Sequence, residues 1–245
     1  MTKVRFLKQP SRLEKWPIKP TEIVLFLCFA LGIVVVLTGL LVKGYEQVSG
    51  ESYNEESLAF GIASGLGLHI GSLLAWLLLK CSNPETKNEK RNGAGRSILV
   101  GIGYLILAYL ILIPITFSWK SLLDYFEIEY ELQAPVTMIM KGGTPLEMSL
   151  MVILAVIIAP VSEELVYRGV LYRYLHQRLP EIVAILIPTV LWSWIHQSLY
   201  SFVPLIFLGY AISLAYRNTG NILSSITFHV LFNAINFGAL FYELE

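Results

Sequence analysis

The stretch Ala159-Pro-Val-Ser-Glu163-Glu164-Leu-Val-Tyr-Arg168 places two adjacent carboxylates and an arginine inside one of the most apolar regions of the chain. An ionisable side chain at the depth of a bilayer core costs about 2.5 to 3.5 kcal/mol on insertion scales. Such residues are therefore rare in membrane helices, and where they occur they usually belong to a site. The stretch predicts a membrane fold whose function depends on buried charge.

The composition around this stretch is that of an integral membrane protein. Of the 245 residues, 55% are hydrophobic and only 15% are charged, and the mean hydropathy is +0.63, which is unlike a soluble domain. The 18 basic residues balance the 18 acidic ones, so no basic excess favours a nucleic-acid partner. Cys28 and Cys81 lie in and just after apolar runs, where we expect no structural disulfide.

Apolar runs long enough to cross a bilayer recur along the chain. About twenty apolar residues span the core as a helix, and the first run lacks the short core and cleavage site of a secretory signal. A short amphipathic helix at the interface is expected around Leu122, Leu123 and Phe126, followed by an irregular Lys-Gly-Gly-Thr-Pro turn. The expected spans cover residues 23–42, 58–79, 97–117, 148–178, 182–197, 202–216 and 222–242.

The predicted fold class is therefore all-α, a polytopic transmembrane bundle of about seven spans with one short interfacial helix. We divide it into a basic N-terminal segment (1–22), N-terminal membrane helices and loops (23–144) and a C-terminal core (145–242) that carries the buried polar residues.

The distribution of basic residues predicts the orientation in the cell membrane. Lysines and arginines gather in the N-terminal segment and in the second loop, residues 80–96. With seven spans, the opposite side holds only Lys43, Lys120 and Lys141. By the positive-inside rule the N-terminus is expected in the cytoplasm and the C-terminus outside.

The acidic pair has two separable roles. Glu164 and Arg168 are i and i+4 on a helix, so they share a face and can form an ion pair. Glu163 lies about 100° further round the helix and need not share that partner. A glutamate in a partly dry site can act as a general base. We therefore assign Glu164 and Arg168 to structure and Glu163 to chemistry.

Two further helices supply matching groups. His196 lies about as far beyond the turn near Pro180 as Glu163 lies before it, so antiparallel helices place the two at nearly equal height. His229 and Asn233 are i and i+4, and an amide N–H suits an oxyanion. These groups can hydrolyse an amide with an activated water, or Glu163, His196 and His229 can hold a divalent metal such as zinc. His69 is alone in its glycine-rich run, and we interpret it as structural.

These residues match the motifs of a known family. E-E-x-x-x-R corresponds to residues 163–168, F-x-x-x-H to residues 192–196, with Trp192 in place of phenylalanine, and H-x-x-x-N to residues 229–233. Over residues 145–242 the chain resembles the CAAX protease and bacteriocin-processing family of intramembrane endopeptidases, which includes CAAX prenyl proteases. The resemblance implies a catalytic set of Glu163, Glu164, His196, His229 and Asn233, supported by Arg168 and Trp192.

The resemblance further implies that Glu163 and His196 activate water and that His229 and Asn233 stabilise the oxyanion. We favour this reading without a metal. The substrate is expected to be a peptide or protein terminus delivered to the lipid bilayer. A non-catalytic binding or immunity protein is the alternative. A proton- or metal-coupled transporter would also use buried carboxylates and imidazoles, but the chain has no internal repeat of the transporter kind.

Overall fold

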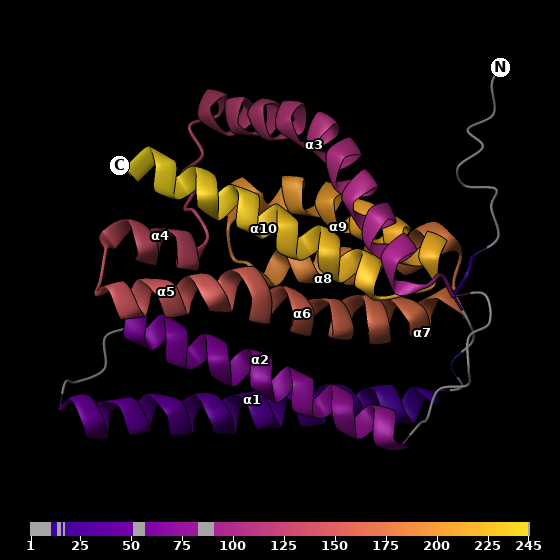
Figure 1. Cartoon of the computed structure of the whole chain (residues 1–245), viewed down its shortest axis with the longest axis horizontal. Helices are drawn as coiled ribbons and strands as arrows, with labels where there is room; N and C mark the ends of the chain where they lie inside the picture. Colours follow the sequence, from indigo (N-terminus) through magenta and orange to yellow (C-terminus); the bar gives the residue numbers. More distant parts are fainter. Residues whose placement is uncertain (1–10, 14–15, 17, 51–56, 83–90, 245) are drawn as a thin grey trace.

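The computed structural model describes residues 11–13, 16, 18–50, 57–82 and 91–244. Within these ranges it is all-helical, which confirms the predicted fold class (Figure 1). The chain runs through α1 (Pro20–Ser49), α2 (Leu58–Ser82), α3 (Ala94–Tyr125), α4 (Ala134–Lys141), one long helix over Pro145–His176, α8 (Glu181–Ile195), α9 (Leu199–Thr219) and α10 (Leu223–Leu244).

Six of the described helices are long and apolar enough to cross a membrane, namely α1, α2, α3, the helix over Pro145–His176, α9 and α10. The seventh expected span, α8, has 15 residues, or about 22 Å at ~1.5 Å per residue, and so falls short of a ~30 Å bilayer core. With α8 the chain passes along the bundle seven times, and the start of α1 and the end of α10 lie at opposite ends (Figure 1).

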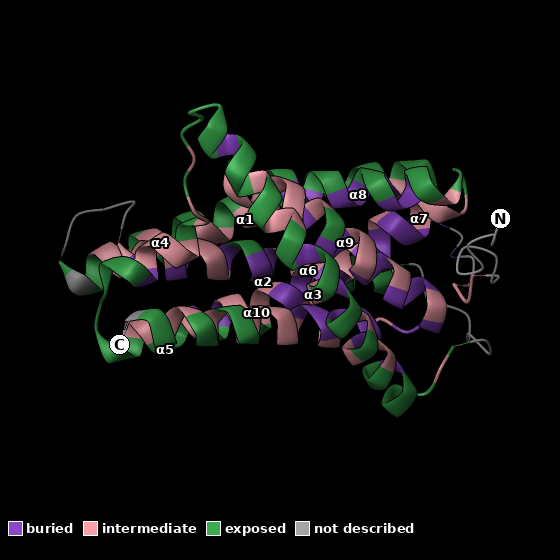
Figure 2. Ribbon diagram, turned by 90° about the horizontal axis from the view of Figure 1, so that it is seen from above, coloured by how far each residue is buried: buried purple, intermediate pink, exposed green. Residues whose placement is uncertain are grey.

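The long helix lies between two groups of helices. α1 packs mainly on α2, and α2 packs in turn on the long helix. α3, α8, α9 and α10 pack together on its other side (Figure 1). Figure 2 shows exposed residues along the outer faces and buried residues towards the middle. The outer faces carry large apolar side chains such as Leu25, Leu31 and Val35, exposed by 67 to 70%, as expected for surfaces that contact lipid.

The short helix predicted around Leu122, Leu123 and Phe126 is not separate from the span before it. Leu122 and Leu123 belong to α3, which runs on to Tyr125, because Leu123 is buried and Trp119 Nε1 donates to the Leu199 carbonyl at 2.9 Å. The separate short helix is α4. The irregular turn at residues 142–144 is present, and Thr144 and Glu147 form a capping box at the start of the next helix.

Basic parts of the chain meet at one end of the bundle. Arg12 N donates to Arg217 O at 3.1 Å, and the Arg178 guanidinium donates to Ile18 O at 2.7 Å. Arg91 donates to Asn221 in the turn before α10. Residues 1–10, 51–56 and 83–90, on which the charge pattern partly depends, lie outside the described residues. The location of this end in the cytoplasm stays a prediction.

Glu181 anchors this basic end, just before the apolar run of α8. Its carboxylate accepts a hydrogen bond from Tyr172 Oη at 2.6 Å and lies 3.1 Å from His176 Nδ1 and 3.2 Å from Arg217 Nε. Burial raises the pKa of Glu181, but hydrogen bonds from His176 and Tyr172 and the charges of His176 and Arg217 outweigh it and lower the pKa to about 2. The carboxylate therefore stays ionised while it joins three chain segments.

Candidate active site

The long helix changes its winding twice, once before the acidic pair and again from Glu164 onward. α5 (Pro145–Ile153) leads into a π-helical segment over Leu154–Ile158, and a second such segment, Glu164–Tyr172, follows α6 (Ala159–Glu163) and leads into α7 (Arg173–His176). π-helical turns are rare and are frequent at functional sites. The side-chain amide of Asn233, on α10, donates to the Ala155 carbonyl in the first segment at 2.8 Å.

Glu164 is the centre of a buried charged group. Arg168 NH1 lies 2.9 Å from Glu164 Oε1, so the ion pair expected from the i, i+4 spacing is present. The same oxygen lies 2.8 Å from His229 Nδ1, and Arg168 also donates to the Gly209 carbonyl at 3.3 Å. All three side chains are nearly inaccessible, at 0% for Glu164, 1% for Arg168 and 3% for His229. Glu164 therefore joins its own helix to α10 and is closed to solvent.

Glu163 is held differently, and it keeps some access, with 14% of its side chain exposed. The indole N–H of Trp192, on α8, donates to Glu163 Oε2 at 2.6 Å. His229 Nε2 lies 4.0 Å from the same oxygen. Among the described residues nothing donates a hydrogen bond to Oε1. One carboxylate oxygen is thus held by Trp192, and the other receives no hydrogen bond from the described residues.

His196 ends α8 beside this carboxylate. Its Nδ1 lies 2.7 Å from the Trp192 carbonyl, and because a carbonyl only accepts, Nδ1 carries the proton and the neutral ring has its lone pair on Nε2. Gln197 follows with φ of 50°, a left-handed conformation that is uncommon outside glycine and often found at sites. Ser198 then caps α9 and donates to the Glu131 carbonyl, which fixes the turn after His196.

His69 is a site neighbour that the sequence interpretation missed. Its Nδ1 lies 2.6 Å from Ser162 Oγ, next to Glu163 in the chain. Ser162 donates to the Ala159 carbonyl, so its oxygen accepts from His69. The sequence held one signal, since Gly61, Gly65 and His69 lie on one helix face. A Cβ atom at Gly65 would meet Leu154 Cδ2 at 2.5 Å, so this face lets α2 approach closely.

The structure thus brings together most of the predicted residues. Glu163, Glu164, Arg168, Trp192 and His229 are joined by the contacts above, and His196 joins them through Trp192. His69, His196 and His229 all lie close enough to Glu163 to interact with its charge. Asn233 is one turn beyond His229, and one of its two amide N–H groups is used by Ala155.

A metal at Glu163, His196 and His229 was the other option from the sequence. Within the described part of the chain, no three His, Cys, Asp or Glu side chains are placed to share a metal ion. A metal at these residues stays the alternative prediction.

Fold and site together define a multi-pass α-helical membrane protein with a carboxylate and imidazole site between its helices. Residues 145–235 match a family model, described as type II CAAX prenyl endopeptidase, Rce1-like. This match confirms the resemblance drawn from the motifs, and it contains the whole predicted catalytic set, whereas His69 and helices α1 to α3 lie outside it. The comparison with curated proteins found no match, and neither did that with solved structures.

Proposed function

We propose that this protein is an intramembrane endopeptidase that hydrolyses a peptide bond in a peptide or protein terminus delivered through the lipid bilayer. The family match supports the class of reaction. The observation that carries the proposal is the partly exposed Glu163 carboxylate, held at Oε2 by Trp192 and without a hydrogen-bond donor at Oε1 among the described residues. A partly accessible carboxylate inside a membrane protein is costly, and catalysis is a reason to keep it.

The reaction begins with a water molecule between Glu163 Oε1 and the unprotonated Nε2 of His196. Glu163 takes a proton from the water while the water oxygen bonds to the substrate carbonyl carbon. The π electrons of the carbonyl group move onto the carbonyl oxygen. His196 accepts a hydrogen bond from the second water hydrogen and orients the lone pair of the attacking oxygen.

The oxyanion is stabilised by donors on α10. Asn233 supplies its remaining amide N–H, and His229, whose Nδ1 is held by Glu164, supplies Nε2–H when its ring carries a proton on each nitrogen. The C–N bond then breaks, its electrons return to nitrogen, and Glu163 passes its proton to the leaving amine. One water is consumed, and the products are a carboxylic acid and an amine.

The depth of the site bears on the kind of substrate. His196 follows α8, so it lies about 22 Å along this helix from the basic end, at ~1.5 Å per residue over 15 residues. A scissile bond has to reach that depth. A terminus carrying a lipid group or an apolar segment can do so, which is why we propose a membrane-delivered substrate.

The test replaces the Glu163 carboxylate, the proposed general base, by an amide of the same shape. The Glu163→Gln protein in phosphatidylcholine proteoliposomes is expected to cleave quenched fluorescent peptides, with and without a C-terminal prenyl group, at least ~100-fold more slowly than wild type, as expected for loss of a general base. Glu147→Gln, on the same helix but in an exposed cap, is the matched control and should stay active. Full activity of Glu163→Gln would contradict the proposal.

The same assay tests the metal. Wild-type activity is expected to persist in 1,10-phenanthroline and EDTA. Activity that is lost on chelation and restored by zinc would instead assign Glu163, His196 and His229 as ligands.

A further inference from the structure

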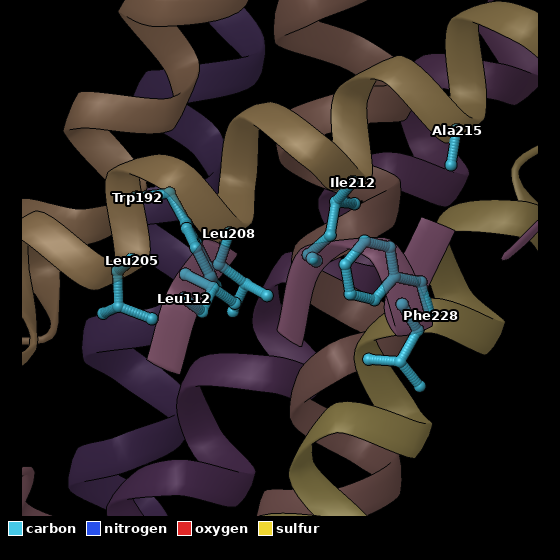
Figure 3. Close-up of a cluster of buried hydrophobic side chains, with 9 residues drawn as sticks. Leu112, Trp192, Leu205, Leu208, Ile212, Ala215 and Phe228 are labelled. Atoms are coloured by element: carbon cyan, nitrogen blue, oxygen red, sulfur yellow. The ribbon is translucent and has the colours of Figure 1, made fainter. Parts of the chain in front are cut away.

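Trp192 is the residue at which the chain departs from the family motif, which has phenylalanine there. Its ring is fully buried in a cluster with Leu112, Leu205 and Leu208, and Figure 3 shows it beside these leucines. A phenylalanine ring would also fill this apolar space, so packing alone does not require an indole. What the indole adds is one N–H donor, and that donor is used on Glu163.

Trp192 contacts both groups that flank the proposed water. Its side chain donates to Glu163 Oε2 at 2.6 Å, and its backbone carbonyl lies 2.7 Å from His196 Nδ1. The two rings also meet edge to face, with centroids 4.9 Å apart. One residue therefore orients the Glu163 carboxylate and fixes the tautomer of His196.

The indole is itself held on several sides. The Arg168 guanidinium lies over its ring at 4.8 Å, and the His229 ring meets it at 5.3 Å. On α9, a Cβ atom at Gly209 would meet the Arg168 guanidinium at 2.9 Å and Trp192 Cε3 at 3.2 Å. With neighbours this close, the ring has little room to turn, and the direction of its N–H is set by the surrounding helices.

We propose that Trp192 is a positioning residue that divides the two oxygens of Glu163: its N–H occupies Oε2 and leaves Oε1 to take the proton from water. The inference rests on the function proposed above and adds which oxygen acts and what directs it. Without the N–H, the carboxylate can rotate about its terminal bond, which is broad and roughly two-fold, and Oε1 is no longer kept facing the water.

The first test is Trp192→Phe, which keeps a buried ring of the kind found in the family motif. A hydrogen bond to a charged group is worth enough to change a rate about 10- to 100-fold. We expect kcat to fall by that factor and KM to stay within about twofold, because Trp192 does not touch substrate. A kcat within about twofold of wild type, or a raised KM with unchanged kcat, would overturn the inference.

Trp194→Phe is the matched control. Trp194 lies two residues away with 69% of its surface exposed, so the same chemical change there is expected to leave kcat and KM unchanged. Thermal unfolding in micelles reports whether the Trp192→Phe protein is folded.

The second test needs no activity. Wild-type protein with ¹⁵N-labelled tryptophan is placed in nanodiscs and gives an indole N–H resonance for its tryptophans. The one resonance that disappears in Trp192→Phe is assigned to Trp192. In Glu163→Ala, which lacks the acceptor, that proton resonance is expected to move upfield. A resonance that does not move overturns the role of Trp192 even if Glu163 proves essential. A wild-type protein that cleaves no probe overturns the proposed function even if the resonance moves.

Discussion

Replacing Arg168 by methionine removes one partner from the buried ion pair. Arg168 NH1 and Glu164 Oε1 lie 2.9 Å apart, and their side chains are 1% and 0% exposed. Among the described residues, Glu164 Oε2 already has no hydrogen-bond partner. Loss of one member of such a pair leaves an uncompensated charge out of water, which costs about 3 to 5 kcal/mol. We expect Arg168→Met to lower the free energy of unfolding by that amount.

Denaturant-induced unfolding in mixed micelles measures this change. Glu164→Gln combined with Arg168→Met removes both charges, and the double variant is expected to regain more than half of the loss. The exposed pair Lys120 and Asp124 has the same i, i+4 spacing and a 2.6 Å contact, so Lys120→Met is the matched control and is expected to have a much smaller effect. A loss below about 1 kcal/mol for Arg168→Met, or no recovery in the double variant, would refute the reasoning.

Two further predictions concern helix packing and pH. A Cβ atom at Gly101 would lie 2.4 Å from the Ser224 backbone oxygen, so Gly101→Ala should push α3 from α10 and lower the unfolding free energy by about 1 to 3 kcal/mol. A Cβ atom at Gly103 would meet no atom of the described chain within 4 Å, so Gly103→Ala should leave stability unchanged or raise it by up to about 1 kcal/mol; equal effects of the two changes in micelle unfolding would contradict the packing argument. Because the pKa of Glu181 is lowered from 4.5 to about 2, its carboxylate stabilises the fold above pH 4.5 and this contribution is lost as the pH falls towards 2. Midpoint temperatures measured from pH 6 to pH 3 should therefore fall more steeply for wild type than for Glu181→Gln, and parallel curves would be the contrary result.

The helices could be predicted because hydropathy alone sets them. A bilayer core demands a fixed length of apolar residues with internal hydrogen bonds, so each long apolar run had one structural solution. The end of α3 was harder, since Leu122 and Leu123 fit an interfacial helix as well as a continued span. The continuation of α3 is fixed by the hydrogen bond from Trp119 to the Leu199 carbonyl, and these two residues lie far apart in the sequence.

Within the site, predictable contacts were those with helical spacing. Glu164 and Arg168 are i and i+4, so their ion pair could be predicted from the sequence. The other contacts join segments 29 to 93 residues apart, such as Trp192 with Glu163 and His69 with Ser162. The spacing of Gly61, Gly65 and His69 marks one face of α2, but such a pattern does not say which helix packs against that face or which side chain His69 meets.

The two π-helical segments also bear on how this protein can change by insertion and deletion. Each wide turn sets the angular phase between the parts of the helix that it joins, and one residue more or less turns everything beyond it by about 100°. Met151 and Leu154, which pack in the core with α2, lie before or at the start of the first segment, and Glu163 lies after it. Deleting one residue between Leu154 and Glu163 would keep the helix and its apolar character. It would, however, turn the Glu163 side chain away from α8. The acidic pair is thus tied to the length of this stretch as firmly as to its composition.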